Sequence, residues 1–225
     1  MRFLFTLFAA ILVLAPGATS RAADAPATLP AAGPRVVCFG DSITKQGYPA
    51  VLGKRLNLDV VNAGVGGHNT KQGLARMEKD VLAHKPDVVV VLFGTNDCRM
   101  AEPSALVPLE QYERNLTTIV ERSRKAGAKV VLCTLPPIDP TPYFTRHKKE
   151  PFDAAGGLAK VVADYAATAR KVAKATDCPL VDLNASLAKE DQKVWLSPDG
   201  VHPSEKGMAM IAERVAEVVK TVVGK

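Results

Sequence analysis

The stretch VVCFGDSIT at residues 36–44 joins a short apolar run to a turn that contains glycine, aspartate and serine. The run at 36–39 is continuous rather than alternating, which is typical of a strand covered on both faces. Gly40 allows the chain to turn tightly, so that Ser42 lies where the strand becomes a helix. This stretch therefore predicts the first strand of an α/β fold, with a serine hydroxyl at the edge of the sheet.

Further apolar runs predict strands of the same buried kind, and helical patterns lie between them. These strands are expected at 59–62, 87–93, 129–134 and 179–182. Helices are expected at 49–56, 70–83, 109–126, 158–175 and 204–223. Strand and helix thus alternate along the chain, an order that favours a parallel sheet with helices on both faces. Because ligands bind at the carboxyl ends of such strands, functional residues are expected directly after them.

The N-terminus has the pattern of a secretory signal peptide at 1–22. Arg2 is followed by an apolar run at 3–15 and then by small residues. The run is shorter than the roughly 20 apolar residues that span a bilayer. We therefore expect an exported protein, periplasmic or secreted, that is not stably inserted in the membrane, with a membrane anchor as the alternative. An Ala/Pro-rich tether is expected at 23–34 and one domain at 35–225.

The charge pattern argues against a nucleic-acid partner. The formal charge is +6, from 29 basic and 23 acidic residues, and loss of Arg2 and Arg21 with the leader would lower it to +4. No dense block of Lys and Arg runs along a helix, so a solvated basic surface is expected.

The cysteines form no CxxC pair and no Cys/His cluster with zinc spacing, so no structural metal is expected. They are Cys38, Cys98, Cys133 and Cys178. An exported protein can pair its cysteines, but a buried free thiol accounts equally well for those in apolar runs. The spacing leaves both alternatives open.

Four polar clusters lie at the predicted sheet edge: 39–44, 62–70, 94–97 and 199–203. Ser42 suits either a nucleophile or a helix N-cap. Asp199 and His202 are three positions apart, so the carboxylate can bond the imidazole, the pair that a nucleophilic serine needs. An Asp-Gly turn with a surface histidine is the alternative.

The two middle clusters suit the binding of a ligand by backbone and amide N–H groups. Residues 62–70 carry three glycines within four positions, which lets the backbone approach a ligand closely. The spacing differs from that of a phosphate-binding loop. Asn96 can donate to an anion, although Gly94 and Asn96 also suit an ordinary turn.

Taken together and in this order, the clusters resemble the blocks of the SGNH hydrolase superfamily, which includes the GDSL esterases and lipases. The matching segments are GDSIT at 40–44, NAGVGG at 62–67, GTND at 94–97 and DGVH at 199–202. Ile43 replaces the usual leucine, and His68 stands where relatives often have aspartate. The GxSxG elbow of α/β-hydrolases is absent around Ser42.

The resemblance implies a flavodoxin-like, three-layer α/β/α sandwich with a five-stranded parallel sheet. It implies Ser42 as nucleophile, His202 as base and Asp199 as the residue that orients the imidazole. The oxyanion would be held by the N–H groups of Ser42 and Gly67 and by the Asn96 amide, with no cofactor. The expected substrate is a small-molecule or glycan ester with a short acyl group, such as acetyl on a carbohydrate.

The stretch 135–157 carries five prolines and is expected to be irregular and to border the site. A substrate rim is expected there from Tyr143, Phe144, Arg146 and Phe152, with a solvated charge run as the alternative. Three other functions stay open: a lysophospholipase or thioesterase, a non-catalytic glycan-binding module, and an acyl transferase.

Overall fold

Five parallel strands form the predicted sheet. They are β1 (Val36–Gly40), β2 (Val60–Gly64), β3 (Val88–Leu92), β4 (Lys129–Cys133) and β5 (Leu180–Val181), in the spatial order β2-β1-β3-β4-β5. The computed structural model describes residues 33–224. The predicted signal peptide at 1–22 and residues 23–32 of the predicted tether lie outside the described residues.

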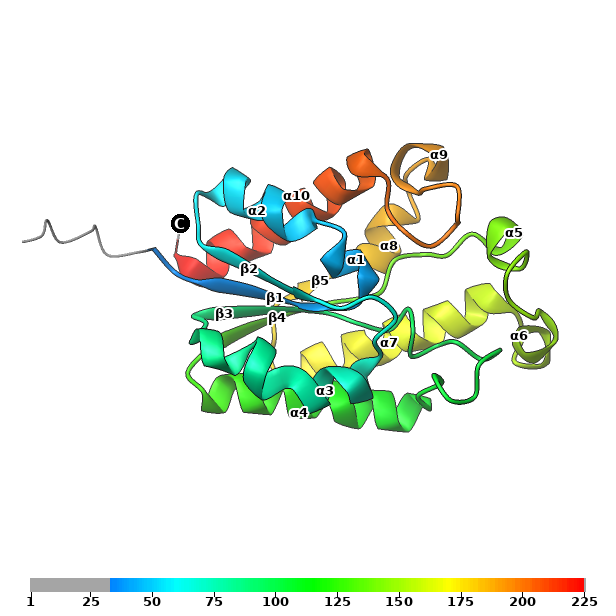
Figure 1. Cartoon of the computed structure of the whole chain (residues 1–225), viewed down its shortest axis with the longest axis horizontal. Helices are drawn as coiled ribbons and strands as arrows, with labels where there is room; N and C mark the ends of the chain where they lie inside the picture. The colour runs from blue at the N-terminus through cyan, green and yellow to red at the C-terminus, as the bar shows by residue number, and fades with distance from the viewer. Residues whose placement is uncertain (1–32, 225) are drawn as a thin grey trace, which may run out of the picture. The chain divides into compact units, whose positions relative to one another are not determined.

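Helices cover both faces of the sheet, which confirms the predicted α/β class with three layers (Figure 1). One face carries α2 (Tyr48–Leu56) and α10 (Glu205–Val223), and the other carries α3 (Thr70–Asp80), α4 (Leu109–Lys125) and α7 (Leu158–Ala175). Alternate residues of each strand enter the two cores, so Val37 and Phe39 pack on one face and Val36 and Cys38 on the other. This two-sided burial explains why the strands are continuous apolar runs.

Several short elements have no bounds in the sequence-based prediction because a single turn shows no hydrophobic period, although a helix start was expected at Ser42 and Leu82 was expected to be helical. They are α1 (Ser42–Lys45), η1 (Leu82–His84), α5 (Pro140–Tyr143), α6 (Glu150–Ala154), α8 (Leu183–Leu187) and α9 (Gln192–Trp195). The stretch 135–157 is therefore not wholly irregular, since it holds α5 and α6. Aspartate caps explain four of the six: Asp41, Asp139, Asp182 and Asp191 each accept a backbone N–H in the first turn of α1, α5, α8 and α9.

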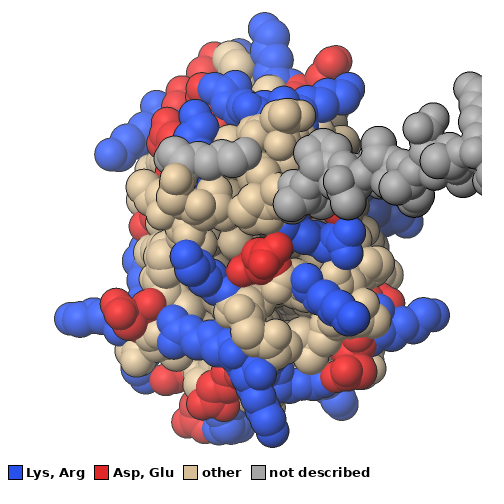
Figure 2. Space-filling view, turned by 90° about the vertical axis from the view of Figure 1, so that its left-hand side faces the viewer, with Lys and Arg blue, Asp and Glu red and all other residues tan. Residues whose placement is uncertain are grey.

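Basic side chains gather where the helices end. Figure 2 views the end of the sheet at which the strands begin, and Lys and Arg surround it. The last helical turns supply Lys54 and Arg55 in α2, Lys79 in α3, Arg122, Arg124 and Lys125 in α4, Lys174 in α7 and Lys220 in α10. Cations stabilise helix C-termini, which accounts for this placement without a polyanionic partner. The absence of a nucleic-acid partner stays a prediction.

The four cysteines lie buried as free thiols, so the alternative of small buried side chains holds. Burial raises the pKa of Cys38 and of Cys98 to about 12, which keeps both protonated at neutral pH. Within residues 33–224, no helix combines the length and apolarity needed to cross a bilayer.

Candidate active site

Ser42 lies at the turn between β1 and α1, at the carboxyl edge of the sheet. Asp41, not Ser42, is the N-cap of α1, and its carboxylate accepts the Ile43 N–H at 2.9 Å. The serine hydroxyl is therefore left free for another partner. Its Oγ lies 2.9 Å from Nε2 of His202, a residue 160 positions away in the chain.

Asp199 holds the other side of the imidazole, with its Oδ2 at 2.5 Å from His202 Nδ1. Its Oδ1 accepts hydrogen bonds from the Ser197 hydroxyl and from the backbone N–H groups of Val201 and His202. Burial alone would raise the pKa of Asp199, but these four hydrogen bonds outweigh it and hold the pKa far below its ordinary value. The carboxylate therefore stays ionised and can fix the tautomer of His202.

Gly200 allows this loop to pack against α5. Its φ is +76°, and a Cβ there would lie 2.5 Å from Pro142 Cγ, so a side chain would be both strained and crowded. The Gly200 carbonyl accepts the Asp139 N–H at 2.9 Å. Helix α5 therefore supports the loop that carries Asp199 and His202.

Ser42, Gly67 and Asn96 line one cavity of about 500 Å³ with Asp199 and His202. Within the described chain, the backbone N–H groups of Ser42 and Gly67 have no acceptor, which leaves both available to a ligand. The Asn96 amide donates to the His68 carbonyl at 3.0 Å and makes a longer contact of 3.5 Å with Asp41 Oδ2. The structure thus brings together all five residues expected in the catalytic triad and the oxyanion hole.

We expect Asn96→Ala to lower kcat by roughly a hundred- to a thousandfold, because losing one preorganised donor destabilises the developing oxyanion. KM should change little, since a ground-state carbonyl accepts a weaker hydrogen bond. Steady-state hydrolysis of 4-nitrophenyl acetate measures both constants, with circular dichroism as the folding control. A folded variant with kcat near wild type would remove Asn96 from the oxyanion hole.

Two buried carboxylates are chain neighbours of candidate site residues, because Asp41 precedes Ser42 and Asp97 follows Asn96. Asp41 and Asp97 are fully buried, and Asp97 accepts hydrogen bonds from the backbone and hydroxyl of Thr70 through a single oxygen. The other oxygen of Asp97 is buried and has no hydrogen-bond partner in the described chain. Burial raises the pKa of Asp97 to about 6 and that of Asp41 to about 7, with the neighbouring Asp97 charge adding to the rise at Asp41.

These raised pKa values predict that stability falls as pH rises above about 4. The unfolded chain releases both protons near the ordinary pKa of 3.8, whereas the folded chain keeps them to about 6 and 7. Unfolding in this window therefore releases protons, so the free energy of unfolding decreases with rising pH. Asp97→Asn should make the decrease between pH 4 and 6 shallower in urea denaturation. An unchanged pH slope in this variant would contradict a raised pKa at Asp97.

Arg76 of α3 connects the turn at Gly40 to the glycine-rich segment 62–70, and no local pattern in the sequence indicates this role. Its guanidinium donates to the Gly40 and Ala63 carbonyls, both at 2.8 Å, and to His68 Nδ1 at 3.2 Å. It also pairs with Asp80 at 3.1 Å. Burial, followed by the Arg76 charge, lowers the pKa of His68, which keeps Nδ1 available as an acceptor. His68, at the position where relatives often have aspartate, therefore accepts a hydrogen bond from Arg76.

We expect Arg76→Gln to lower the free energy of unfolding by about 2 kcal/mol, because two backbone carbonyls lose charged donors. It should also lower kcat more than KM, since Ser42 and Gly67 would be held less firmly relative to each other. Urea denaturation and 4-nitrophenyl acetate kinetics measure these effects. Arg122→Gln is the matched control on α4, because Arg122 pairs with exposed Glu78 and neither residue lines the cavity. Equal effects of the two substitutions would contradict the role of Arg76.

The expected rim residues divide into two groups. Tyr143 and Arg146 line the cavity, together with His147 of the same stretch and with Arg99, which the sequence did not single out. Phe152 does not border the cavity as expected, because its ring is fully buried against Tyr143 and Phe144. Phe144 is half-buried and also lies outside the lining. The rings of both phenylalanines therefore pack against Tyr143 on the side away from the cavity.

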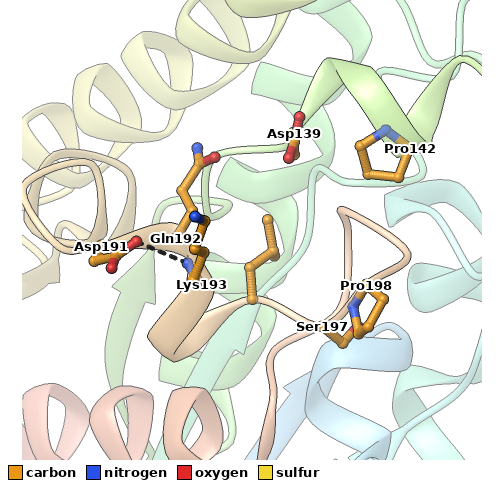
Figure 3. A pocket seen from close by; sticks show the side chains of 8 residues that line it. Asp139, Pro142, Asp191, Gln192, Lys193, Ser197 and Pro198 are labelled. Carbon is orange, nitrogen blue, oxygen red and sulfur yellow. Dashed lines mark hydrogen bonds between the residues drawn. The ribbon is translucent and has the colours of Figure 1, made fainter.

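A second cavity of about 600 Å³ lies beside the loop that leads into Asp199 and His202 (Figure 3). Asp139 and Pro142 of the α5 segment line it on one side, Gln192 and Lys193 of α9 on a second, and Ser197 and Pro198 on a third. Ser42 and His202 are not among its lining residues, so the candidate site is the first cavity. Among residues 33–224, no three His, Cys, Asp or Glu side chains group closely enough to hold a metal ion.

This geometry agrees with the comparison to known families. The model of the GDSL-like lipase/acylhydrolase family matches residues 38–210, which include all four polar clusters. The chain belongs to this family. The sequence-based resemblance to the GDSL esterases is thereby confirmed.

Curated relatives of this GDSL family member include enzymes that act on esters. It is 33% identical over 192 residues to the isoamyl acetate-hydrolyzing esterase 1 homolog of Mus musculus, covering 77% of this chain and 76% of that protein. It is 31% identical over 223 residues to an acetylxylan esterase of Xylanibacter ruminicola, covering 83% of this chain but only 43% of that longer enzyme. The lipoprotein YqeF of Bacillus subtilis is 32% identical over 213 residues, with 81% and 88% covered.

Solved structures of the same kind superpose on this GDSL domain. A lipase/acylhydrolase from Enterococcus faecalis gives a TM-score of 0.71 at 25% identity, covering 84% of this chain and 96% of that one. The acetyl xylan esterase AlAXEase gives a TM-score of 0.69 at 27% identity, with 82% and 99% covered. The GDSL chain is therefore a hydrolase that acts on ester bonds.

Proposed function

We propose that this GDSL hydrolase is a serine esterase that removes short acyl groups, above all acetyl, from a carbohydrate through an acyl-enzyme. The proposal is carried mainly by the contacts of His202, which bonds Ser42 through one ring nitrogen and Asp199 through the other. This is the arrangement in which an imidazole can remove the serine proton while a carboxylate stabilises the resulting charge.

In the proposed mechanism, Ser42 Oγ attacks the ester carbonyl while its proton moves to His202 Nε2. The bond from the acyl carbon to the alcohol oxygen then breaks, and His202 gives the proton to the departing alcohol. Water next attacks the acyl-enzyme, with His202 again as base, and releases the acid and free Ser42. The Ser42 and Gly67 N–H groups and the Asn96 amide stabilise the oxyanion in both steps.

The lining of the catalytic cavity supports a short acyl group and a polar alcohol. Val201 is the only aliphatic residue among those described as lining it, and the rest are polar, aromatic or glycine. A long acyl chain would meet few aliphatic side chains there, and each CH₂ contributes about 0.8 kcal/mol only when it is buried against apolar surface. Carbohydrate hydroxyls, in contrast, suit amide, hydroxyl and guanidinium groups. The acetyl ester activities named for two relatives agree with this proposal.

The test is a screen of 4-nitrophenyl esters of increasing chain length together with acetylated glycans. We expect kcat/KM to be highest for acetyl and to fall with each added carbon. Preference for long acyl groups would instead favour a lysophospholipase or thioesterase. A fluorophosphonate probe separates an enzyme from a glycan-binding module, because only an activated Ser42 becomes labelled. Transfer of acetyl to added sugar in place of water would indicate a transferase.

We also propose that the chain is exported, because residues 1–22 have the pattern of a secretory signal peptide. Acetylated polysaccharides outside the cytoplasm would then be accessible to it. Expression with and without residues 1–22, followed by fractionation and N-terminal sequencing, tests this. Retention of the full-length chain in the cytoplasm would contradict export.

A further inference from the structure

The wall of the catalytic cavity carries two guanidinium groups that the proposed hydrolysis does not use. Arg99 follows the Asn96 cluster and Arg146 follows α5, so two distant segments bring positive charge to one cavity. The only carboxylate among the lining residues is Asp199, which is already bound to His202. The part of the cavity that faces a substrate is therefore positively charged.

Arg146 is fixed in place but has unused donors. One nitrogen of its guanidinium donates to the Asp199 backbone carbonyl at 2.5 Å, which holds the group beside the catalytic loop. Within residues 33–224 no carboxylate pairs with it, and its side chain is exposed. A guanidinium has five N–H donors in a planar fork, so most of them stay free for a ligand.

Arg99 is paired with Glu102 and keeps further N–H donors at the cavity wall. Glu102 accepts a hydrogen bond from Arg99 and also lies 3.6 Å from His147 Nδ1. The His147 ring stacks on Tyr143 with centroids 4.3 Å apart, which keeps it in the cavity wall near both arginines. Burial, followed by the charges of Arg99 and Arg146, lowers the pKa of His147, which is consistent with a net positive field at this place.

We propose that Arg99 and Arg146 form a subsite for an anionic substituent on the alcohol part of the ester. This substituent is a carboxylate or a phosphate. The inference rests on the proposed function and narrows its substrate class to acetyl esters of acidic sugars. The planar fork of arginine matches both groups through paired hydrogen bonds. Arg146 is the cation of its segment that reaches the cavity. The nearby Lys148 and Lys149 are exposed and do not line the cavity, and Lys149 pairs with Asp153.

The experiment compares three substrates that differ only in the group at carbon 6: acetylated glucose, acetylated glucuronic acid and acetylated glucose 6-phosphate. For the wild-type chain at low salt, kcat/KM should be roughly tenfold or more higher for at least one acidic substrate than for acetylated glucose. Comparison of acetylated glucuronic acid with acetylated glucose 6-phosphate shows whether a carboxylate or a phosphate is preferred. The difference should shrink at high salt, because the cavity is open to solvent.

Three variants test the residues through the ratio of acidic to neutral kcat/KM, which cancels any general loss of catalysis. Arg146→Gln should bring the ratio towards one. Glu102→Gln should raise it, because Arg99 loses its neutralising partner. Lys148→Gln is the matched control two residues from Arg146, and it should leave the ratio unchanged.

The outcomes separate this inference from the function on which it rests. A wild-type chain that hydrolyses 4-nitrophenyl acetate but gives a ratio near one overturns the anionic subsite alone. A ratio that falls equally in Arg146→Gln and Lys148→Gln overturns the assignment to Arg146. A chain that hydrolyses no ester at all overturns the proposed function and this inference with it.

Discussion

Ser42→Ala should lower kcat for 4-nitrophenyl acetate by roughly 10⁴- to 10⁶-fold, because Ser42 carries the hydroxyl that bonds the His202 imidazole. The fold should persist, since the Ser42 hydroxyl bonds only His202, and the N-cap of α1 is Asp41. The free energy of unfolding should therefore stay close to that of the wild type. Stopped assays of acetate release and urea denaturation measure the two quantities on the same preparation.

The control for Ser42→Ala is Ser197→Ala. The Ser197 hydroxyl lies two positions before Asp199 in the chain and donates to its Oδ1. This variant loses one of several hydrogen bonds to Asp199 and should keep most activity and full labelling by fluorophosphonate. Labelling should be absent only in Ser42→Ala. Activity of Ser42→Ala near that of wild type would show that another residue is the nucleophile.

Asp199→Asn should lower kcat by roughly 10⁴-fold, because the hydrogen bonds around residue 199 would force His202 into the wrong tautomer. Three donors point at Oδ1: the Ser197 hydroxyl and the N–H groups of Val201 and His202. An asparagine must keep its oxygen there and so direct its NH₂ at His202 Nδ1. The imidazole would then accept at Nδ1 and carry its proton on Nε2, where it faces Ser42 and cannot act as a base.

Asp199→Ala is the informative comparison, because it removes the carboxylate without imposing the wrong tautomer. We expect it to be less active than wild type and less stable than Asp199→Asn, since the three donors to Oδ1 lose their acceptor. KM should change less than kcat in Asp199→Asn, because Asp199 acts through His202. A pH–rate profile of Asp199→Asn identical to that of wild type would contradict the orienting role.

The features that the sequence determined are those encoded within a few neighbouring residues. Continuous apolar runs identified the strands because both faces of each strand are buried. The pairing of Asp199 with His202 followed from a spacing of three, which a single turn can close. The four clusters could be assigned to one sheet edge because the carboxyl ends of parallel strands share an edge.

The tertiary structure alone decided which distant groups meet. Ser42 and His202 are 160 positions apart, and their 2.9 Å contact depends on the strand order and on the seating of the final loop against α5. Arg76 reaches carbonyls on two strands, and Tyr143 rather than Phe152 faces the cavity. No local pattern encodes such contacts, because they arise from how separate elements pack. The burial that raises the pKa values of Asp41 and Asp97 has the same origin.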